Sequence, residues 1–259
     1  MAQIDSTAKV SPEAALADDV RVGPYAIVGA SVSIGSGTEI GPHVRIEGPT
    51  AIGERNRFIG HASIGTDPQD LKFGKEKTEL RIGNDNVFRE FITINRGTEG
   101  GGALTSIGSN NFMMAYSHIA HDCHIGDSTI FANGATLAGH VDVGDSSTIG
   151  AFAAVHQFCR VGDHAFIGAA SICVQDVLPF CKTVGNRDPK TYGINTLGLE
   201  RKGFPKETIE ALQRAYRILI RSKLKLADAL SRLDAELSHF PEVRYLAEFV
   251  RASRRGFIR

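Results

Sequence analysis

The stretch VGPYAIVGASVSIGSGTEIGPHVRI, residues 22–46, decides the fold because an aliphatic residue recurs in it at every sixth position. The repeated positions are Val22, Val28, Ile34, Ile40 and Ile46. Glycine often follows the aliphatic residue, as Gly23 and Gly35 do, and the residue four places after it is usually small. A six-residue period fits neither an amphipathic helix, whose period is about 3.6, nor an ordinary alternating strand, whose period is about two.

The same period runs through most of the first two thirds of the chain. It holds from Ile4 to Ile64, returns at Ile82, and runs one residue out of phase from Ile107 to Cys173. A fixed short period predicts a solenoid. Three hexapeptides would form one triangular coil, and their aliphatic residues would stack inside it at the spacing of about 4.8 Å between neighbouring strands. We therefore expect a mainly β fold, a parallel β-helix of hexapeptide repeats.

Two segments break the period, and the pattern changes near the C-terminus. Residues 66–81 are charged and residues 97–104 are rich in glycine, so we expect both to be loops inserted into the β-helix of residues 1–189. From residue 190 apolar residues are spaced by three and four, with Pro205 and Pro241 near the expected helix starts. Residues 190–259 are therefore expected to form a C-terminal α-helical domain.

Charge divides in the same way as the expected architecture. Residues 1–188 hold 14 Lys and Arg against 21 Asp and Glu, whereas residues 189–259 hold 15 against 8. The basic C-terminal part is either a solvated surface or a site for an acidic carrier protein or phosphates. The balanced total argues against a nucleic-acid partner. The chain shows no signal-peptide pattern and no run of about 18 apolar residues, so we expect a cytoplasmic protein without a membrane span.

The chain has four cysteines and no CxxC pair, which predicts reduced thiols. Cys123 and Cys159 fall on the small position of the repeat, and Cys173 falls on the aliphatic ladder itself. We therefore expect these thiols to fill the core of the β-helix.

Residues 117–126, SHIAHDCHIG, combine three histidines with a carboxylate and a thiol. Ile119 and Ile125 keep the inward register, so the histidines should point outward. Folding the numbering by eighteen stacks residues of successive coils. This arithmetic predicts that six polar residues converge on one edge of the prism: His118, His121, Asp122, His140, His156 and Gln157. A lone exposed histidine is usually without function, but a convergent group indicates a site.

Imidazoles on adjacent coils would also suit zinc. Carbonic anhydrases built from hexapeptide repeats use two histidines five residues apart and a third that is distant in sequence. No two of the nine histidines in this chain are five residues apart. We therefore expect no metal, although a site that spans two subunits stays open.

Seven short segments together resemble the UDP-N-acetylglucosamine O-acyltransferase family, which catalyses the first step of lipid A biosynthesis. They are QDLKF (69–73), INRGT (94–98), YSHIAHDC (116–123), TLAGH (136–140), AVHQFC (154–159), VGNRDP (184–189) and GLERKGF (198–204). The resemblance extends to the terminal RRGFIR and implies a left-handed β-helix. It also implies transfer of a 3-hydroxyacyl group from acyl carrier protein to the 3-hydroxyl of UDP-N-acetylglucosamine, in a homotrimer with active sites between neighbouring prisms. No cofactor is expected, because the phosphopantetheine arrives on the carrier protein.

The resemblance also implies roles for individual residues. His121 would be the general base, Asp122 would orient its imidazole, and the Gly139 amide would bind the oxyanion. The implied substrate contacts are Gln69, Asp70, Lys72, His118, His140, His156, Gln157, Asn195, Arg201 and Lys202. Leu197 stands where the family has an acidic uridine contact, so we expect nucleotide recognition to be rearranged.

Ala169 is implied to stop the acyl tail. It follows Ile167 by two places, as His121 follows Ile119, and lies 48 residues after His121, about 2.7 coils or roughly 13 Å along the axis. Relatives with glycine at this position have room for longer acyl tails. The methyl group of Ala169 therefore predicts a preference for shorter acyl chains. The residues alone leave open an N-acyltransferase acting on an amino-sugar nucleotide, a zinc carbonic anhydrase and a non-catalytic solenoid.

Overall fold

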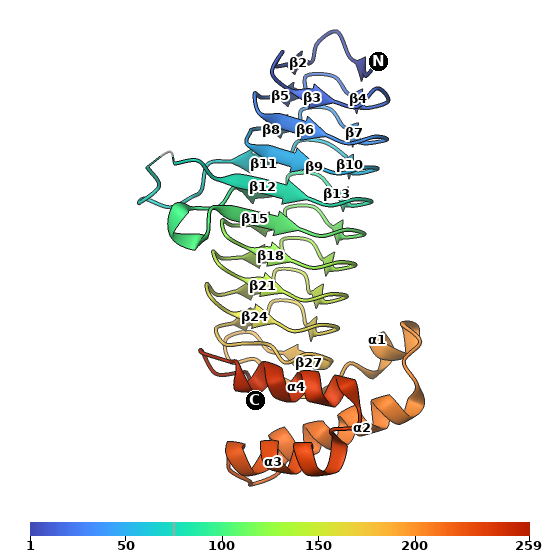
Figure 1. The fold of residues 1–259 in the computed structure, drawn as a ribbon, viewed down its shortest axis with the longest axis vertical. Coiled ribbons are helices and arrows are strands. Elements are labelled where there is room, and N and C mark those ends of the chain that lie inside the picture. Colours follow the sequence, from blue (N-terminus) through green and yellow to red (C-terminus); the bar gives the residue numbers. More distant parts are fainter. Residues whose placement is uncertain (75) are drawn as a thin grey trace.

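The computed structural model describes residues 1–74 and 76–259. Most of the chain winds into a three-sided, left-handed parallel β-helix, which confirms the predicted fold (Figure 1). Strands eighteen residues apart pair side by side, as His118 does with Thr136 and Thr136 with Ala154. The hexapeptide period therefore sets both the corners and the register.

The strands form three faces, which we name A, B and C. Face A contains β1 Gln3–Ile4, β4 Arg21–Val22, β7 Glu39–Ile40, β10 Arg57–Phe58, β13 Val87–Phe88, β16 Phe112–Met113, β19 Ile130–Phe131, β22 Thr148–Ile149, β25 Phe166–Ile167, β27 Cys181–Val184 and β28 Lys190–Ile194. Face B contains β2 Lys9–Val10, β5 Ile27–Val28, β8 Arg45–Ile46, β11 Ser63–Thr66, β14 Thr93–Asn95, β17 His118–Ile119, β20 Thr136–Leu137, β23 Ala154–Val155 and β26 Ile172–Cys173. Face C contains β3 Ala15–Leu16, β6 Val32–Ile34, β9 Thr50–Ile52, β12 Glu79–Ile82, β15 Leu104–Ile107, β18 His124–Ile125, β21 Asp142–Val143 and β24 Arg160–Val161.

The interior of the prism is filled by the ladder residues of the three faces. Ile46, Ile64 and Ile94 are fully buried, and the rings of Phe58 and Phe88 stack 4.6 Å apart. All four cysteines are buried and unpaired, as predicted for those on the repeat. Burial raises the pKa of the Cys123 thiol to about 12, so this sulfur stays protonated at neutral pH.

Both insertions leave the corner that joins face B to face C. The first lies between β11 and β12 and spans residues 67–78, which is shorter than the predicted 66–81 because Thr66 and Glu79 belong to strands. The second lies between β14 and β15 and contains a 3-10 turn at Glu99–Gly101. Their backbones project from the same side of the prism (Figure 1).

The register across each insertion gives its net length. Phe58 pairs with Phe88, 30 residues later, and Ile82 pairs with Ile107, 25 residues later, whereas an uninterrupted coil takes eighteen. The second insertion therefore adds seven residues. Since seven is one more than a whole hexapeptide, the period resumes one residue out of phase.

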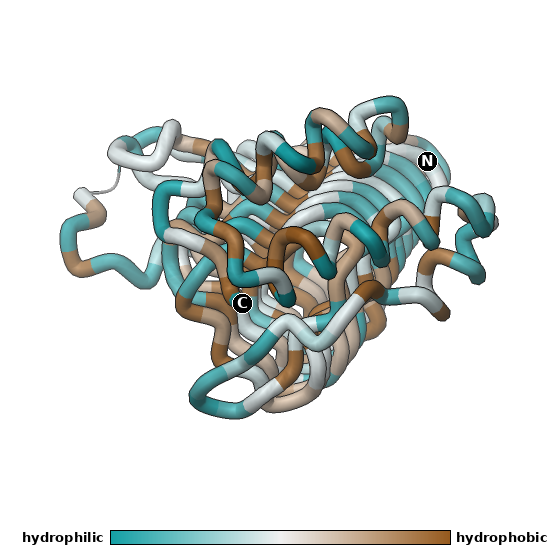
Figure 2. Tube along the Cα trace, turned by 90° about the horizontal axis from the view of Figure 1, so that it is seen from below, coloured by the Kyte–Doolittle hydropathy of each residue, from teal (hydrophilic) through white to brown (hydrophobic). Residues whose placement is uncertain are grey.

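The C-terminal part begins with a strand rather than a helix. β28 pairs antiparallel with β27, so strands continue to Ile194, past the boundary predicted at residue 190. The helices that follow are α1 Thr196–Arg201, α2 Lys206–Tyr216 with a π-helical turn at Arg217–Arg221, α3 Leu226–Leu237 and α4 Pro241–Arg251. Figure 2 shows them lying across the end of the stacked coils. None of the described helices is long and apolar enough to cross a membrane.

Candidate active site

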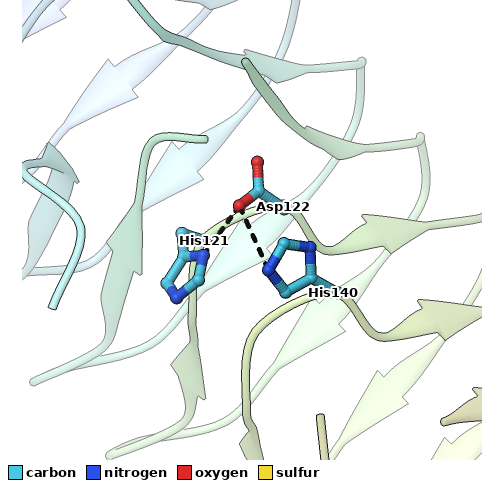
Figure 3. Close-up of side chains that lie close together, drawn as sticks. All are labelled: His121, Asp122 and His140. Carbon is cyan, nitrogen blue, oxygen red and sulfur yellow. Dashed lines mark hydrogen bonds and ion pairs between the residues drawn. The ribbon is translucent and has the colours of Figure 1, made fainter. Parts of the chain in front are cut away.

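His121 and Asp122 lie in the turn between β17 and β18, at the corner that joins faces B and C. Asp122 adopts the left-handed region with φ 58°, which aspartate tolerates better than most residues. The side chain of Asp122 is buried, whereas that of His121 is partly exposed. Figure 3 shows both side chains together with His140, which comes from the next coil.

The carboxylate of Asp122 accepts three hydrogen bonds. The Thr98 backbone N–H donates to Oδ1 over 2.7 Å, and the Thr98 hydroxyl donates to Oδ2 over 2.6 Å. Nδ1 of His121 lies 2.7 Å from the same Oδ2. Because an ionised carboxylate only accepts, Nδ1 of His121 carries the proton and Nε2 is left as the basic nitrogen. This arrangement orients an imidazole for proton abstraction.

Gly139 packs against the ring of His121. A β-carbon at position 139 would lie 2.7 Å from Cε1 and 2.8 Å from Nε2 of His121. Across residues 1–74 and 76–259, the Gly139 N–H makes no hydrogen bond, so it is free to donate to a ligand. Because Gly139 packs against the ring and its N–H is free, this amide is the candidate oxyanion donor of the site.

His140 closes another side of the site. Its Nε2 lies 3.7 Å from Oδ2 of Asp122, and its ring stands edge-on to His121 with centroids 5.1 Å apart. Burial lowers the pKa of His140, while the carboxylates of Asp122 and Asp70 oppose this shift. Asp70 belongs to the first insertion, which leaves the same corner between faces B and C.

The same three side chains satisfy the spacing of a metal site. His121, Asp122 and His140 each offer a ligand atom, all within 4.8 Å of one another. However, both oxygens of Asp122 already accept hydrogen bonds, and Nδ1 of His121 faces the carboxylate as a donor. A cation would have to displace these bonds, so the donors suit a carboxylate–imidazole pair better than a metal.

The other predicted contacts on the β-helix are His118 on face B, and His156 and Gln157 at the corner between faces B and C. On face B, Nδ1 of His118 is 2.7 Å from the Thr93 hydroxyl, and burial lowers the pKa of His118. His156 and Gln157 are exposed on a later coil, where Nδ1 of His156 lies 3.2 Å from the Gln157 carbonyl oxygen.

In the first insertion, Gln69 and Lys72 are exposed. The Lys72 backbone N–H donates to the Asp70 carboxylate over 3.0 Å, which shapes the turn.

The predicted contacts in the C-terminal part lie apart from His121 within one chain. Asn195, Arg201 and Lys202 are on or next to α1, which lies beside the last coil (Figure 1). The side chain of Asn195 donates to the His164 carbonyl over 3.1 Å and ties α1 to the coil. Leu197 is 66% exposed on the same helix.

Ala169 is exposed, but it lies at a different corner from His121. It follows β25 at the corner between faces A and B, whereas His121 follows β17 at the corner between faces B and C. The separation of 48 residues is not a multiple of eighteen, which explains the difference. Face B lies between the two positions.

The structure adds site residues that the sequence pattern did not reveal. Thr98 and Gly101, both from the second insertion, contact Asp122, and a β-carbon at position 101 would lie 2.1 Å from the Asp122 carboxyl carbon. In the sequence, the run of glycines at 100–102 was the only sign that this segment approaches another part of the chain closely. A cavity of about 440 Å³ also opens beside His140, between face C and the C-terminal tail, and Arg254 and Arg255 line it.

Comparisons with known proteins agree with this fold and site. A family described as bacterial transferase hexapeptide (six repeats) matches residues 13–48 and 104–139, which places the chain in the class of hexapeptide-repeat transferases. A second family, described as domain 2 of UDP-N-acetylglucosamine O-acyltransferase, matches residues 176–258.

Individual relatives define the family more closely. The chain is 50% identical over 257 residues to the acyl-(acyl-carrier-protein)–UDP-N-acetylglucosamine O-acyltransferase of Stenotrophomonas maltophilia, covering 99% of this chain and 98% of the relative. Its structure matches that of LpxA from Acinetobacter baumannii with a TM-score of 0.96 and 42% identity, covering 99% of both chains. The UDP-N-acetylglucosamine acyltransferase of Arabidopsis matches with a TM-score of 0.87 and 36% identity, over 99% of this chain and 100% of that one. The chain belongs to the UDP-N-acetylglucosamine O-acyltransferase family.

Proposed function

We propose that this protein transfers a 3-hydroxyacyl group from acyl carrier protein to the 3-hydroxyl of UDP-N-acetylglucosamine, the first step of lipid A synthesis. One observation carries the proposal beyond family membership. Nδ1 of His121 is bound to the buried Asp122 carboxylate, and the ring edge with Nε2 packs against Gly139, whose N–H is free. A base and an oxyanion donor thus stand next to each other, as acyl transfer requires.

The chemistry follows from this geometry. A sugar hydroxyl is a weak nucleophile near neutral pH, so Nε2 of His121 removes its proton as the oxygen attacks the thioester carbonyl carbon. The Gly139 N–H donates to the oxyanion that forms, and Asp122 stabilises the imidazolium. The carbon–sulfur bond then breaks, and the imidazolium returns the proton to the departing thiolate of the carrier arm.

Direct transfer needs no acyl-enzyme intermediate. The cysteine in the site segment, Cys123, is fully buried with a raised pKa and therefore a poor nucleophile. The proposed chemistry at His121 and Asp122 needs no bound cofactor, since the pantetheine thiol belongs to the donor.

The proposed substrate contacts are those that the family resemblance implies near His121. Asp70 and His140 would bind the sugar or the acyl hydroxyl, while His118, Gln69 and Lys72 flank the approach. His156 and Gln157 continue the same corner towards the C-terminal end, where the carrier arm would enter.

The proposed assembly is a homotrimer in the cytoplasm. Within one chain α1 lies beside the last coil, so Asn195, Arg201 and Lys202 reach an active site most directly if it is shared with a neighbouring copy. The excess of basic residues in 189–259 suits acyl carrier protein as the donor.

The test is an assay of the purified protein with UDP-N-acetylglucosamine and a panel of 3-hydroxyacyl carrier proteins, with the product identified by mass spectrometry. We expect an ester at the 3-hydroxyl. A UDP-sugar with a 3-amino group serves as the competing acceptor, and faster transfer to the amine would instead establish an N-acyltransferase. Analytical ultracentrifugation measures the proposed trimer.

A further inference from the structure

We infer that Thr98 is a positioning residue for the proposed reaction: its two hydrogen bonds fix the Asp122 carboxylate, which in turn orients His121. This inference rests on the proposed function. It also gives the second insertion a role, because Thr98 and Gly101 lie directly against that buried carboxylate.

Thr98 reaches Asp122 with two different donors. Its backbone N–H binds Oδ1 and its hydroxyl binds Oδ2, so both oxygens are held from one residue. Thr98 is only 7% exposed, and Asp122 is 2% exposed. Hydrogen bonds to a charged group in a dry environment are stronger than neutral ones in water, so this pair of contacts resists rotation of the carboxylate.

The backbone of the second insertion fixes Thr98 in turn. The N–H groups of Gly101 and Ala103 both donate to the Thr98 carbonyl oxygen, over 3.0 Å and 2.7 Å. The absence of a side chain at Gly101 lets the turn lie directly on Asp122. Close approach to a carboxylate therefore explains the glycine at position 101, whereas Gly102 adopts a positive φ of 94°.

The consequence concerns the orientation of the His121 imidazole. Oδ2 receives both the Thr98 hydroxyl and Nδ1–H of His121, so its position decides where the imidazole points. If the hydroxyl were lost, the carboxylate would gain freedom to turn, and Nε2 would less often face the substrate hydroxyl. This loss would act on the chemical step rather than on binding.

Three variants separate positioning from folding. Thr98→Val keeps the shape of the side chain and the backbone N–H donor but removes the hydroxyl. Thr98→Ser keeps the hydroxyl. The matched control is Thr129→Val, because Thr129 is also buried and its hydroxyl donates to the Asn111 side chain over 2.7 Å inside the prism. We expect Thr98→Val to lower kcat roughly 10- to 100-fold with KM unchanged. Thr98→Ser should restore kcat, and Thr129→Val should leave it at the parental value.

A double variant tests whether Thr98 acts through Asp122. In an Asp122→Asn background the additional Thr98→Val change should lower kcat by less than about two-fold, because coupled residues are not additive. An undiminished loss in that background, or failure of Thr98→Ser to restore kcat in folded protein, overturns the inference.

A measurement without acyl transfer keeps this inference distinct from the proposed function. The low-field proton resonance of His121 Nδ1–H is assigned by its loss in His121→Gln and followed by NMR. It should shift in Thr98→Val and stay in place in Thr98→Ser and Thr129→Val. An unchanged resonance in Thr98→Val overturns the positioning role. If the resonance shifts but the parent esterifies no UDP-N-acetylglucosamine, the positioning role stands and the proposed function is wrong.

Discussion

The imidazole of His121 lies directly against Gly139, the residue one coil later. A β-carbon at position 139 would come within 2.8 Å of Nε2, closer than real β-carbons approach other atoms. The eighteen-residue coil thus places the proposed base and the proposed oxyanion donor side by side, although they are distant in sequence. Any side chain at position 139 would have to push the ring aside.

Gly139→Ala should therefore damage the chemical step while leaving the fold intact. The added methyl group displaces the His121 ring by a few tenths of an ångström or more, and misplacement of about 1 Å can cost about 10²-fold in rate. We expect kcat to fall about 10²-fold, as measured by initial rates with saturating substrates. Gly193→Ala is the matched control, because a β-carbon at position 193 would meet no atom within 4 Å. Equal rates for the two variants would rule out the steric argument.

The sequence predicted those parts of the site that obey the repeat. His140 stacks above Asp122 because they are eighteen residues apart, so the length of one coil predicts this contact. Thr98 and Gly101 were not predicted, because an insertion has no phase and its path is decided by tertiary contacts. Ala169 shows that the position of a residue within its hexapeptide does not determine the corner at which it lies. It holds the same position as His121 in its repeat but lies at another corner.

The C-terminal part illustrates the same limit. Apolar spacing predicted helices in this part, and α2, α3 and α4 carry that pattern over several turns. It did not predict β28, a strand that forms because β27 leaves an edge open for antiparallel pairing. α1 was also missed, because a helix of six residues is too short to show a period.

His121→Ala should remove nearly all turnover while the β-helix and the proposed trimer persist. Loss of a general base typically costs about 10²- to 10⁴-fold in rate. Steady-state kinetics gives the rate, and circular dichroism with ultracentrifugation checks fold and assembly. His124→Ala is the control, since His124 is exposed on face C and its ring contacts Ser106 instead of Asp122. Near-parental turnover in folded His121→Ala would exclude His121 as the base.

Charge reversal at Arg201 and Lys202 should weaken binding of the nucleotide or the carrier protein. Both side chains are exposed on the basic C-terminal part. Their contribution should fall with added salt, because exposed charges are screened over about 10 Å at 0.1 M ionic strength. The measurement is KM for each substrate between low and high salt in the parent and in the Arg201→Glu/Lys202→Glu variant. KM values that match the parent at every salt concentration would remove both residues from the site.

Acidification should destabilise the protein through His118 and His140. Burial lowers the pKa of both imidazoles below the value of about 6.5 expected in the unfolded chain. The unfolded state therefore binds more protons, so the free energy of unfolding falls as pH drops below about 6.5 towards the folded-state values. The slope is at most about 1.4 kcal/mol per pH unit for each histidine.

Urea denaturation at fixed protein concentration between pH 7.5 and pH 5 measures this slope. His118→Gln should flatten it, because one proton-binding group is removed from the unfolded state. His239→Gln, at an exposed site in the C-terminal part, should keep the parental slope. A His118→Gln slope as steep as that of the parent would show that this histidine does not contribute.

Ala169 should limit the length of the acyl chain that the enzyme accepts. We expect the chain to run across face B and to end at this residue. The outward residues of this face after His118 are Thr136, Ala154 and Ile172, so the outward side chains nearest His121 and Asp122 are smaller than the one three strands later. An acyl tail that leads from His121 across this face would approach the corner where Ala169 is exposed.

Ala169→Gly should shift the donor preference towards longer 3-hydroxyacyl chains, and Ala169→Met should shift it towards shorter ones. Each methylene that gains or loses a buried place changes the free energy of binding by about 0.8 kcal/mol, or roughly four-fold in kcat/KM. The measurement is kcat/KM for carrier proteins charged with chains of increasing length. The kcat for the best donor of each variant should remain near the parental value, because the chemistry at His121 is untouched. If both variants keep the parental chain-length profile, the tail ends elsewhere, and the outward side chain of Ile172, which is 41% exposed on the same face, becomes the next position to change.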